Sequence, residues 1–84
     1  MLAEVLRKAP LTQEKVSFAW RQAVGQTMDR VTMVELRDGT LIVRARDAAW
    51  KREVERAIPV VRHRLEAVLG ARIIRRIEVT VASA

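Results

Sequence analysis

The chain has 84 residues, half of them hydrophobic, and carries a formal net charge of +6 at pH 7. This length fits a single domain, expected over residues 1–84, and the hydrophobic share argues against intrinsic disorder. The absence of cysteine excludes disulfides and thiolate metal sites, and no stretch has the length of a membrane span or of a signal-peptide core, so we expect a cytoplasmic protein.

Two helices are predicted at the N-terminal end of the chain. Residues 1–9 form a short helix candidate that ends at Pro10. Thr12 offers an N-cap for a second helix, which runs up to Gly25 as its C′ residue. The apolar residues of this helix recur at helical spacing, and they are Val16, Ala19, Trp20 and Ala23. Residues 26–30 are predicted to form a turn before the first strand.

A β-hairpin is predicted from about residue 31 to residue 46. Asp38-Gly39 is a strong signal for a two-residue turn between its strands. When this turn closes, Leu36 pairs with Leu41 and Val34 pairs with Val43 on the face toward the core. The opposite face then carries Met33, Glu35, Arg37, Thr40, Ile42, Arg44 and Arg46. The register of the turn therefore gathers three arginines on the side away from the core.

A long helix follows the hairpin, with Asp47 as its natural N-cap. Its apolar residues form one stripe with a period of 3.6 residues: Trp50, Val54, Ala57, Ile58, Val61, Leu65 and Val68. Pro59 lies within this stripe and removes the backbone hydrogen bond to the carbonyl of Glu55. Because the stripe stays in phase across Pro59, we expect either a kinked helix or two abutting helices.

A third strand is predicted for residues 72–82, after Gly70 ends the long helix. Its inward residues are expected to be Ile77, Val79 and Val81, and its outward residues Ile74, Arg76, Glu78 and Thr80. The predicted order is α-α-β-β-α-β, an α+β fold with helices on one face of a three-stranded sheet and the other face open. The third strand can lie beside either strand of the hairpin.

No group of residues has the spacing of a catalytic or metal site. His63, the only histidine, lies on the outward face of the long helix without a nearby nucleophile. Glu35 and Glu78 are expected to pair with arginines on the sheet rather than to act as an acid and a base. Phosphate-binding and dinucleotide-binding glycine motifs are absent from the sequence. We therefore expect no enzyme activity, no cofactor or metal ion, and no small-molecule substrate.

Arginine side chains form two candidate surfaces. Guanidinium groups on the open sheet face suit phosphate oxygens, and the candidate nucleic-acid-binding residues there are Arg37, Arg44, Arg46 and Arg76. A secondary basic stripe on the long helix holds Arg52 and Arg56, near His63. The alternative to a binding function is that the arginines reflect a GC-rich genome, which raises the arginine content of its proteins.

Tryptophans are the largest side chains of the chain, and both are expected in the core. Trp20 lies on the apolar stripe of its helix, and Trp50 is expected to pack against Leu41 and Val43 and so anchor the long helix to the sheet. Because Trp50 is in the first turn, its indole N–H could still be partly exposed. The open sheet face would then have no aromatic side chain, which disfavours recognition of nucleic acid by base stacking.

Three segments carry an ordered set of motifs: FAWRQAVGQTM from residue 18, LRDGTLIVRARDAAWKREV from residue 36, and RLEAVLGARIIRRIEVTV from residue 64. They contain a tryptophan helix that ends in glycine, a hairpin with glycine in its turn, a tryptophan that opens the next helix, and a Leu-Gly pair before the last strand. The residues at these places are Trp20, Gly25, Gly39, Trp50 and Gly70. In this order the motifs resemble the DciA-type bacterial replicative helicase loaders, from about Leu2 to Val81.

The resemblance implies a KH-like domain that helps to place the hexameric replicative DNA helicase on single-stranded DNA when replication starts. It also implies a protein without ATPase activity of its own. One departure is that the stretch after Gly25 lacks a histidine and a proline often seen there. No G-x-x-G loop is present either, so the usual KH clamp on nucleic acid is not expected. The other departure concerns the C-terminal end. Many relatives grip the helicase with a flexible tail. If residues 1–84 are the whole protein, the folded domain must make that contact.

Two other functions fit the same residues. One is a KH-like module that binds ribosomal or structured RNA, because phosphate contacts do not distinguish RNA from DNA. The other is a plain protein–protein interaction domain whose arginines reflect genome composition. Binding of the cognate helicase, with and without single-stranded DNA, separates these possibilities.

Overall fold

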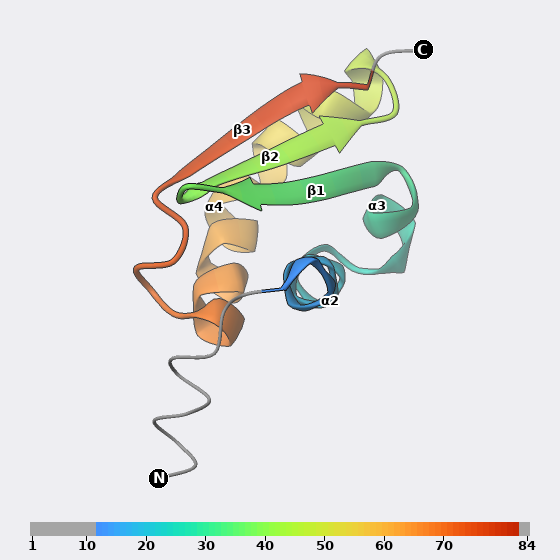
Figure 1. The fold of residues 1–84 in the computed structure, drawn as a ribbon. Helices are drawn as coiled ribbons and strands as arrows, with labels where there is room; N and C mark the ends of the chain where they lie inside the picture. The colour runs from blue at the N-terminus through green and yellow to red at the C-terminus, as the bar shows by residue number, and fades with distance from the viewer. Residues whose placement is uncertain (1–11, 83–84) are drawn as a thin grey trace, which may run out of the picture.

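The computed structural model describes residues 12–82 (Figure 1). In chain order, the elements are α2 (Gln13–Val24), α3 (Gln26–Arg30), β1 (Thr32–Arg37), β2 (Thr40–Ala45), α4 (Ala48–Leu69) and β3 (Arg76–Val81). The predicted α+β fold and its order α-α-β-β-α-β are confirmed. The helix predicted for residues 1–9 lies outside the described residues. The second helix of the observed order is α3, so the prediction of a turn over residues 26–30 is wrong.

Side-chain caps start the two longer helices where the sequence predicts them. The hydroxyl oxygen of Thr12 accepts a 3.2 Å hydrogen bond from the backbone N–H of Lys15 at the start of α2. At the start of α4, a carboxylate oxygen of Asp47 accepts a 2.9 Å bond from the backbone N–H of Trp50. Each bond satisfies a backbone donor that has no partner inside the helix. Both helices therefore begin at the predicted residues.

The β1–β2 hairpin has the predicted register. Asp38 and Gly39 form its turn with φ angles of 49° and 80°, the positive values that a type I′ turn needs at both central positions. The strands are antiparallel, and the pairs include Leu36–Leu41 and Val34–Val43. Since successive side chains of a strand alternate between faces, this register also fixes which residues face away from the core.

β3 lies beside β2, and the two strands are parallel. The sheet order is β1-β2-β3, which answers the question that the sequence left open. Thr40 lies opposite Arg76, and Val43 lies opposite Val79. A parallel pair requires a long crossover connection, which α4 provides. β2 is therefore the central strand, and α2 and α4 lie on one side of the sheet (Figure 1).

α4 is a single helix that runs through Pro59. Pro59 has no backbone N–H, so the carbonyl of Glu55 loses its helical donor. Both residues are exposed, and water can therefore supply that hydrogen bond. The alternative of two abutting helices is wrong, because α4 is continuous through Pro59.

The core lies between the helices and the inner face of the sheet. Trp20 is its largest member and is 1% exposed, which confirms its predicted place. The cluster of buried core residues is Val16, Ala19, Trp20, Ala23, Val34, Leu41, Val43, Val54, Val61, Leu65 and Ile74. It draws on both longer helices, on the hairpin and on the segment before β3.

Two expectations about burial near the C-terminal end are wrong. Ile74 was expected to face outward, but it is 2% exposed and belongs to the core. Because β3 begins only at Arg76, the alternation of a strand does not extend back to residue 74. Val68 is 50% exposed, and its neighbour Leu69 packs on the core instead. Val81 lies opposite Ala45 on the inward face, as predicted, but it is 43% exposed because it ends an edge strand.

Trp50 does not anchor α4 in the way that the sequence predicts. Its side chain is only partly buried, and it lies outside the set of residues packed on the cluster that contains Leu41 and Val43. Asp47 caps α4 only two residues after β2 ends at Ala45. The first turn of α4, which contains Trp50, therefore follows the end of β2 and does not lie over the middle of that strand. Val54, one turn later, is the first residue of α4 in the core.

Candidate nucleic-acid interface

The outward side chains of the sheet form three rows that cross all three strands. The register places Arg37, Thr40 and Arg76 in the row nearest the hairpin turn. The next row holds Glu35, Ile42 and Glu78, and the third holds Met33, Arg44 and Thr80. Arg37, Arg44 and Arg76 are all exposed on this open face, as predicted. An acidic row therefore separates the arginines at the turn end from Arg44.

Carboxylates pair with three of the four predicted phosphate-binding arginines. Glu35 forms ion pairs with Arg37 on its own strand and, at 3.5 Å, with Arg44 on β2. Glu78 pairs with Arg76 at 3.5 Å. The prediction that these two glutamates pair with arginines across the sheet is confirmed for Glu35 and Arg44, whereas Glu78 pairs within its own strand. Exposed pairs of this kind contribute little to stability because solvent screens them, so phosphate oxygens can replace the carboxylates at little cost.

The hydrogen bond from Arg37 and the positive charge of its guanidinium lower the pKa of the Glu35 carboxyl below its usual value. Arg44 adds a smaller effect in the same direction. Glu35 is therefore ionised at neutral pH and holds both arginines close to the middle of the open face. The open face is consequently a mixed surface rather than a purely basic one.

Arg46 lies one residue beyond β2. Its backbone N–H donates a 2.8 Å hydrogen bond to the carbonyl of Val31, which extends the hairpin ladder by one pair. Its side chain is exposed and pairs with no acidic residue among residues 12–82. Arg46 is therefore available to a ligand, although it stands outside the three rows.

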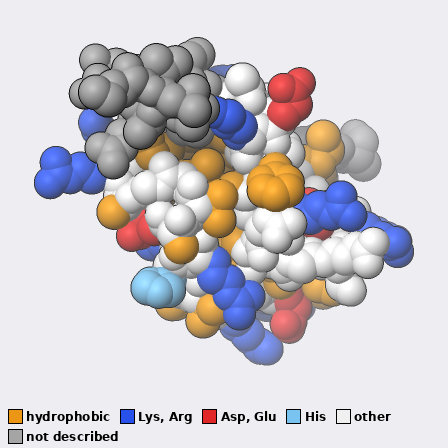
Figure 2. Space-filling view, turned by 90° about the horizontal axis from the view of Figure 1, so that it is seen from below, with side chains coloured by type: hydrophobic (Ala, Val, Ile, Leu, Met, Phe, Trp, Pro, Cys, Tyr) orange, Lys and Arg blue, Asp and Glu red, His pale blue; other side chains and the backbone are white. Residues whose placement is uncertain are grey.

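The secondary basic stripe lies on the side of α4 that faces away from the sheet. Arg52 and Arg56 are exposed there, and Arg56 pairs with Glu53 at 3.3 Å. His63 is also exposed, as predicted. Figure 2 looks at the molecule from the side of α2 and α4, where Lys and Arg side chains are dispersed among hydrophobic and uncharged groups on the visible surface. The stripe and the open sheet face do not form one surface.

Two arginines of α4 have structural roles that the sequence did not suggest. A terminal nitrogen of Arg62 donates to the carbonyl oxygens of Ile74 and Arg75, at 3.2 and 3.1 Å, and Nε of Arg62 bonds the carboxylate of Glu66 at 3.2 Å. Arg64 donates a 3.0 Å bond to the carbonyl of Ala23 near the end of α2. Arg62 thus holds the segment before β3 in place, and Arg64 ties α4 to α2.

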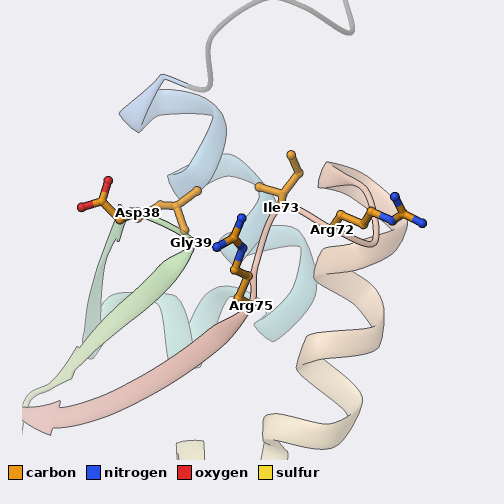
Figure 3. Close-up of a pocket in the computed structure, with 6 residues that line it drawn as sticks. Asp38, Gly39, Arg72, Ile73 and Arg75 are labelled. Carbon is orange, nitrogen blue, oxygen red and sulfur yellow. The ribbon is translucent and has the colours of Figure 1, made fainter.

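A further basic site lies at the turn end of the sheet and was missed in the sequence. The β1–β2 turn and the loop between α4 and β3 enclose an open hollow of about 480 Å³. Its lining residues are Leu36, Asp38, Gly39, Arg72, Ile73 and Arg75 (Figure 3). The only signal in the sequence is the density of arginines in GARIIRR after the long helix, and that signal does not indicate which of them meet the hairpin turn.

Potential metal ligands do not cluster in the described part of the fold, and two aspartates near the sheet have structural positions. Across residues 12–82, no three histidine, cysteine or acidic side chains come together as a metal site. Asp47 is engaged as a helix cap, and Asp38 is in the hairpin turn. None of the helices in this range combines the length and the apolar character that crossing a membrane requires.

The comparisons with known proteins identify the family. The family described as Dna[CI] antecedent, DciA, matches residues 1–79. The chain belongs to the DciA family. The resemblance seen in the sequence is thereby confirmed, and membership of the DciA family implies a general role in loading the replicative helicase. A search of curated proteins finds no match.

The residues that carry the DciA pattern mostly have structural roles in the fold. Gly25 and Gly70 follow α2 and α4 with φ angles of 84° and 105°, and Gly39 sits in the hairpin turn. Trp20 fills the core, whereas Trp50 is only partly buried at the start of α4. Four of these five residues thus end a helix, close the turn or fill the core, and none of them belongs to the open arginine face.

Proposed function

We propose that this DciA-family chain is a non-enzymatic adaptor in the cytoplasm that places the hexameric replicative helicase on single-stranded DNA at the start of replication. The family match over residues 1–79 carries this proposal. The loader needs no cofactor or metal ion, because it acts by binding two macromolecules and not by chemistry of its own.

The exposed arginines of the open sheet face support the DNA-binding half of the proposal. Arg37, Arg44 and Arg76 are held by weak, exposed ion pairs, and Arg46 adds a further guanidinium nearby. The face has no aromatic side chain for base stacking, so binding is expected to be weak and nearly independent of sequence. It should weaken with salt, with a slope of about −0.7 per phosphate contact.

The decisive experiment is size-exclusion chromatography of the chain with its cognate hexameric helicase, with and without a single-stranded oligodeoxynucleotide. A complex of chain and helicase, and more oligonucleotide bound by the helicase in the presence of the chain, are expected. A chain that elutes apart from the helicase under both conditions contradicts the proposal.

Variants locate the DNA surface in the same experiment. Replacing Arg37, Arg44 and Arg46 by glutamine keeps a polar sheet face and should leave the fold intact, but it should remove most of the DNA affinity. The control replaces Arg52 and Arg56 on α4 by glutamine. Loss of binding in the control alone moves the site to the helix side. A single-stranded RNA of the same sequence tests the alternative of an RNA-binding module.

A further inference from the structure

We propose that the hollow between the β1–β2 turn and the α4–β3 loop binds one phosphate group of a nucleic-acid strand, with Arg75 as its main ligand and Arg72 as the second. The inference rests on the proposed function, which it deepens by naming a phosphate site distinct from the open sheet face. The hollow holds about 480 Å³ and is open to solvent. This volume is within the range of roughly 300–1,000 Å³ typical of ligand sites.

The hairpin turn fixes the backbone of Arg75. The carbonyl oxygen of Gly39 accepts hydrogen bonds from the backbone N–H groups of Arg75 and Arg76, at 2.8 and 3.2 Å. The side chain of Arg75 then passes over Gly39, where an added Cβ atom would lie 3.2 Å from its Cδ. Glycine therefore leaves the space that Arg75 needs to reach into the hollow.

The direction of the side chains favours an anion as the ligand. Figure 3 shows the guanidinium of Arg75 pointing into the space between the turn and Ile73, whereas the carboxylate of Asp38 points away from it. Arg72 stands on the opposite rim with its guanidinium directed outward. Because exposed side chains change rotamer within nanoseconds, Arg72 can turn toward a bound phosphate.

The charges of this site are less compensated than those of the sheet face. Among residues 12–82, neither Arg72 nor Arg75 forms an ion pair with a carboxylate, whereas Arg37, Arg44 and Arg76 each have one. A phosphate arriving at the hollow does not have to displace an acidic side chain. The guanidinium group also matches a phosphate geometrically, since it can donate two parallel hydrogen bonds.

Hydrogen bonds and side-chain burial fix the end of the loop, next to Arg75, before any ligand arrives. Arg62 bonds the carbonyl oxygens of Ile74 and Arg75, and the side chain of Ile74 is buried in the core. A site that is already ordered loses little entropy on binding. Leu36 and Ile73 provide apolar lining beside the arginines, on which the sugar or base of the same nucleotide can rest.

The position of the hollow connects it to the open face. Arg37 and Arg76 form the sheet row nearest the hairpin turn, and the same turn forms one wall of the hollow. A strand that leaves the hollow over the turn therefore meets two further arginines. Four guanidinium groups lie at this end of the sheet, from Arg37, Arg72, Arg75 and Arg76.

Fluorescence anisotropy with a labelled deoxythymidine oligonucleotide tests the site. Replacing both Arg72 and Arg75 by glutamine should lower the affinity at least tenfold and flatten the salt slope by about 0.7 for each lost phosphate contact. The control variant replaces Arg52 and Arg56, which removes the same number of charges from α4, and should lose much less. Oligonucleotides with and without a 5′-phosphate show whether a terminal or an internal phosphate is held.

Amide chemical shifts of the unaltered protein give a readout that does not depend on any variant. Addition of the same oligonucleotide should shift the amide signals of Gly39, Ile73 and Arg75. If the oligonucleotide binds but these signals stay in place and the double variant keeps its affinity, the inference is wrong and the proposed function stands. If the protein binds no oligonucleotide, even with the helicase present, the DNA-binding half of the proposed function fails, and the phosphate site fails with it.

Discussion

Nε1 of the Trp20 indole donates a 2.8 Å hydrogen bond to the hydroxyl oxygen of Thr32. The hydroxyl of Thr32 in turn donates a 2.7 Å bond to the backbone carbonyl of Met28. Both Trp20 and Thr32 are buried, at 1% and 8% exposed. The two bonds join α2, α3 and the first residue of β1, so a polar group in the core sets where the hairpin leaves the helices.

Replacement of Thr32 by valine should break both of these hydrogen bonds while keeping the shape of the side chain. The buried N–H of Trp20 then has no acceptor, and an unsatisfied buried polar group costs about 1–3 kcal/mol. Urea unfolding followed by circular dichroism measures the loss. Thr80→Val on the exposed face of β3 is the matched control and should change stability by about 0.5 kcal/mol or less. Equal stability of the two variants would contradict the role of the Trp20–Thr32 bond.

The two tryptophans should differ in their importance for stability. Trp20→Ala opens a large cavity in the core and should cost about 3–5 kcal/mol. Trp50→Ala should cost distinctly less, because Trp50 is partly exposed and lies outside the core cluster. Denaturant unfolding of both variants gives the comparison. If Trp50→Ala lost as much stability as Trp20→Ala, the first turn of α4 would be shown to anchor the helix to the sheet.

Arg62→Gln should loosen the segment that leads into β3. The change removes the charged donor that bonds the carbonyl oxygens of Ile74 and Arg75. A hydrogen bond of this kind contributes about 1 kcal/mol, and partial exposure of the Arg62 side chain reduces the effect. Hydrogen exchange should become faster at the amides of Arg75 and Arg76. Arg56→Gln, which breaks only an exposed ion pair on α4, should leave that exchange unchanged.

Glu35→Gln should strengthen the binding of single-stranded DNA. The change frees Arg37 and Arg44 from their carboxylate and removes one negative charge from the open face. An increase in affinity of about two- to fivefold is expected from the strength of exposed ion pairs. Glu53→Gln, which frees Arg56 on α4, is the control. If only the Glu53 variant binds more tightly, the helix stripe and not the sheet face contacts DNA.

The pH dependence of DNA binding should follow the titration of Glu35. Arg37 lowers the pKa of this carboxyl in the folded protein, so its ion pairs stabilise the fold above the unfolded-state pKa. That contribution is lost as the pH falls through the lowered pKa, below the usual value of 4.5. Over the same range, affinity for a deoxythymidine oligonucleotide should rise more in the unaltered protein than in Glu35→Gln. Parallel pH profiles would rule out Glu35 as the group responsible.

Local signals in the sequence were enough to predict the hairpin and the two longer helices. Asp38-Gly39 determines the register of β1 and β2, because few other turns have two positive φ angles. Thr12 and Asp47 cap α2 and α4 through bonds that span only three residues. Each of these features depends on neighbours in the chain and could therefore be predicted without knowing the fold.

Features that depend on distant residues could not be predicted in this way. The burial of Ile74 follows from where β3 begins, and that position is set by hydrogen bonds from Arg75 and Arg76 to Gly39. The same contacts create the hollow beside the turn. Arg62 donates hydrogen bonds to carbonyl groups more than ten residues away in the chain. The periodicity of the sequence does not predict contacts over that separation. The sequence placed four arginines on one face, but it did not show that three of them pair with glutamates, which reduces the charge of that face.

The parallel pairing of β2 with β3 has a consequence for the order of folding. The β1–β2 hairpin closes through a two-residue turn, and such hairpins form within about 1–10 μs. β3 can join only after the whole of α4 has been bridged, since Thr40 meets Arg76 across that helix, and this closure has a larger entropic cost. Detachment of β3 is accordingly the natural first step of local unfolding. It would carry Arg75 away from Gly39, so the phosphate site should disappear while the hairpin is still formed.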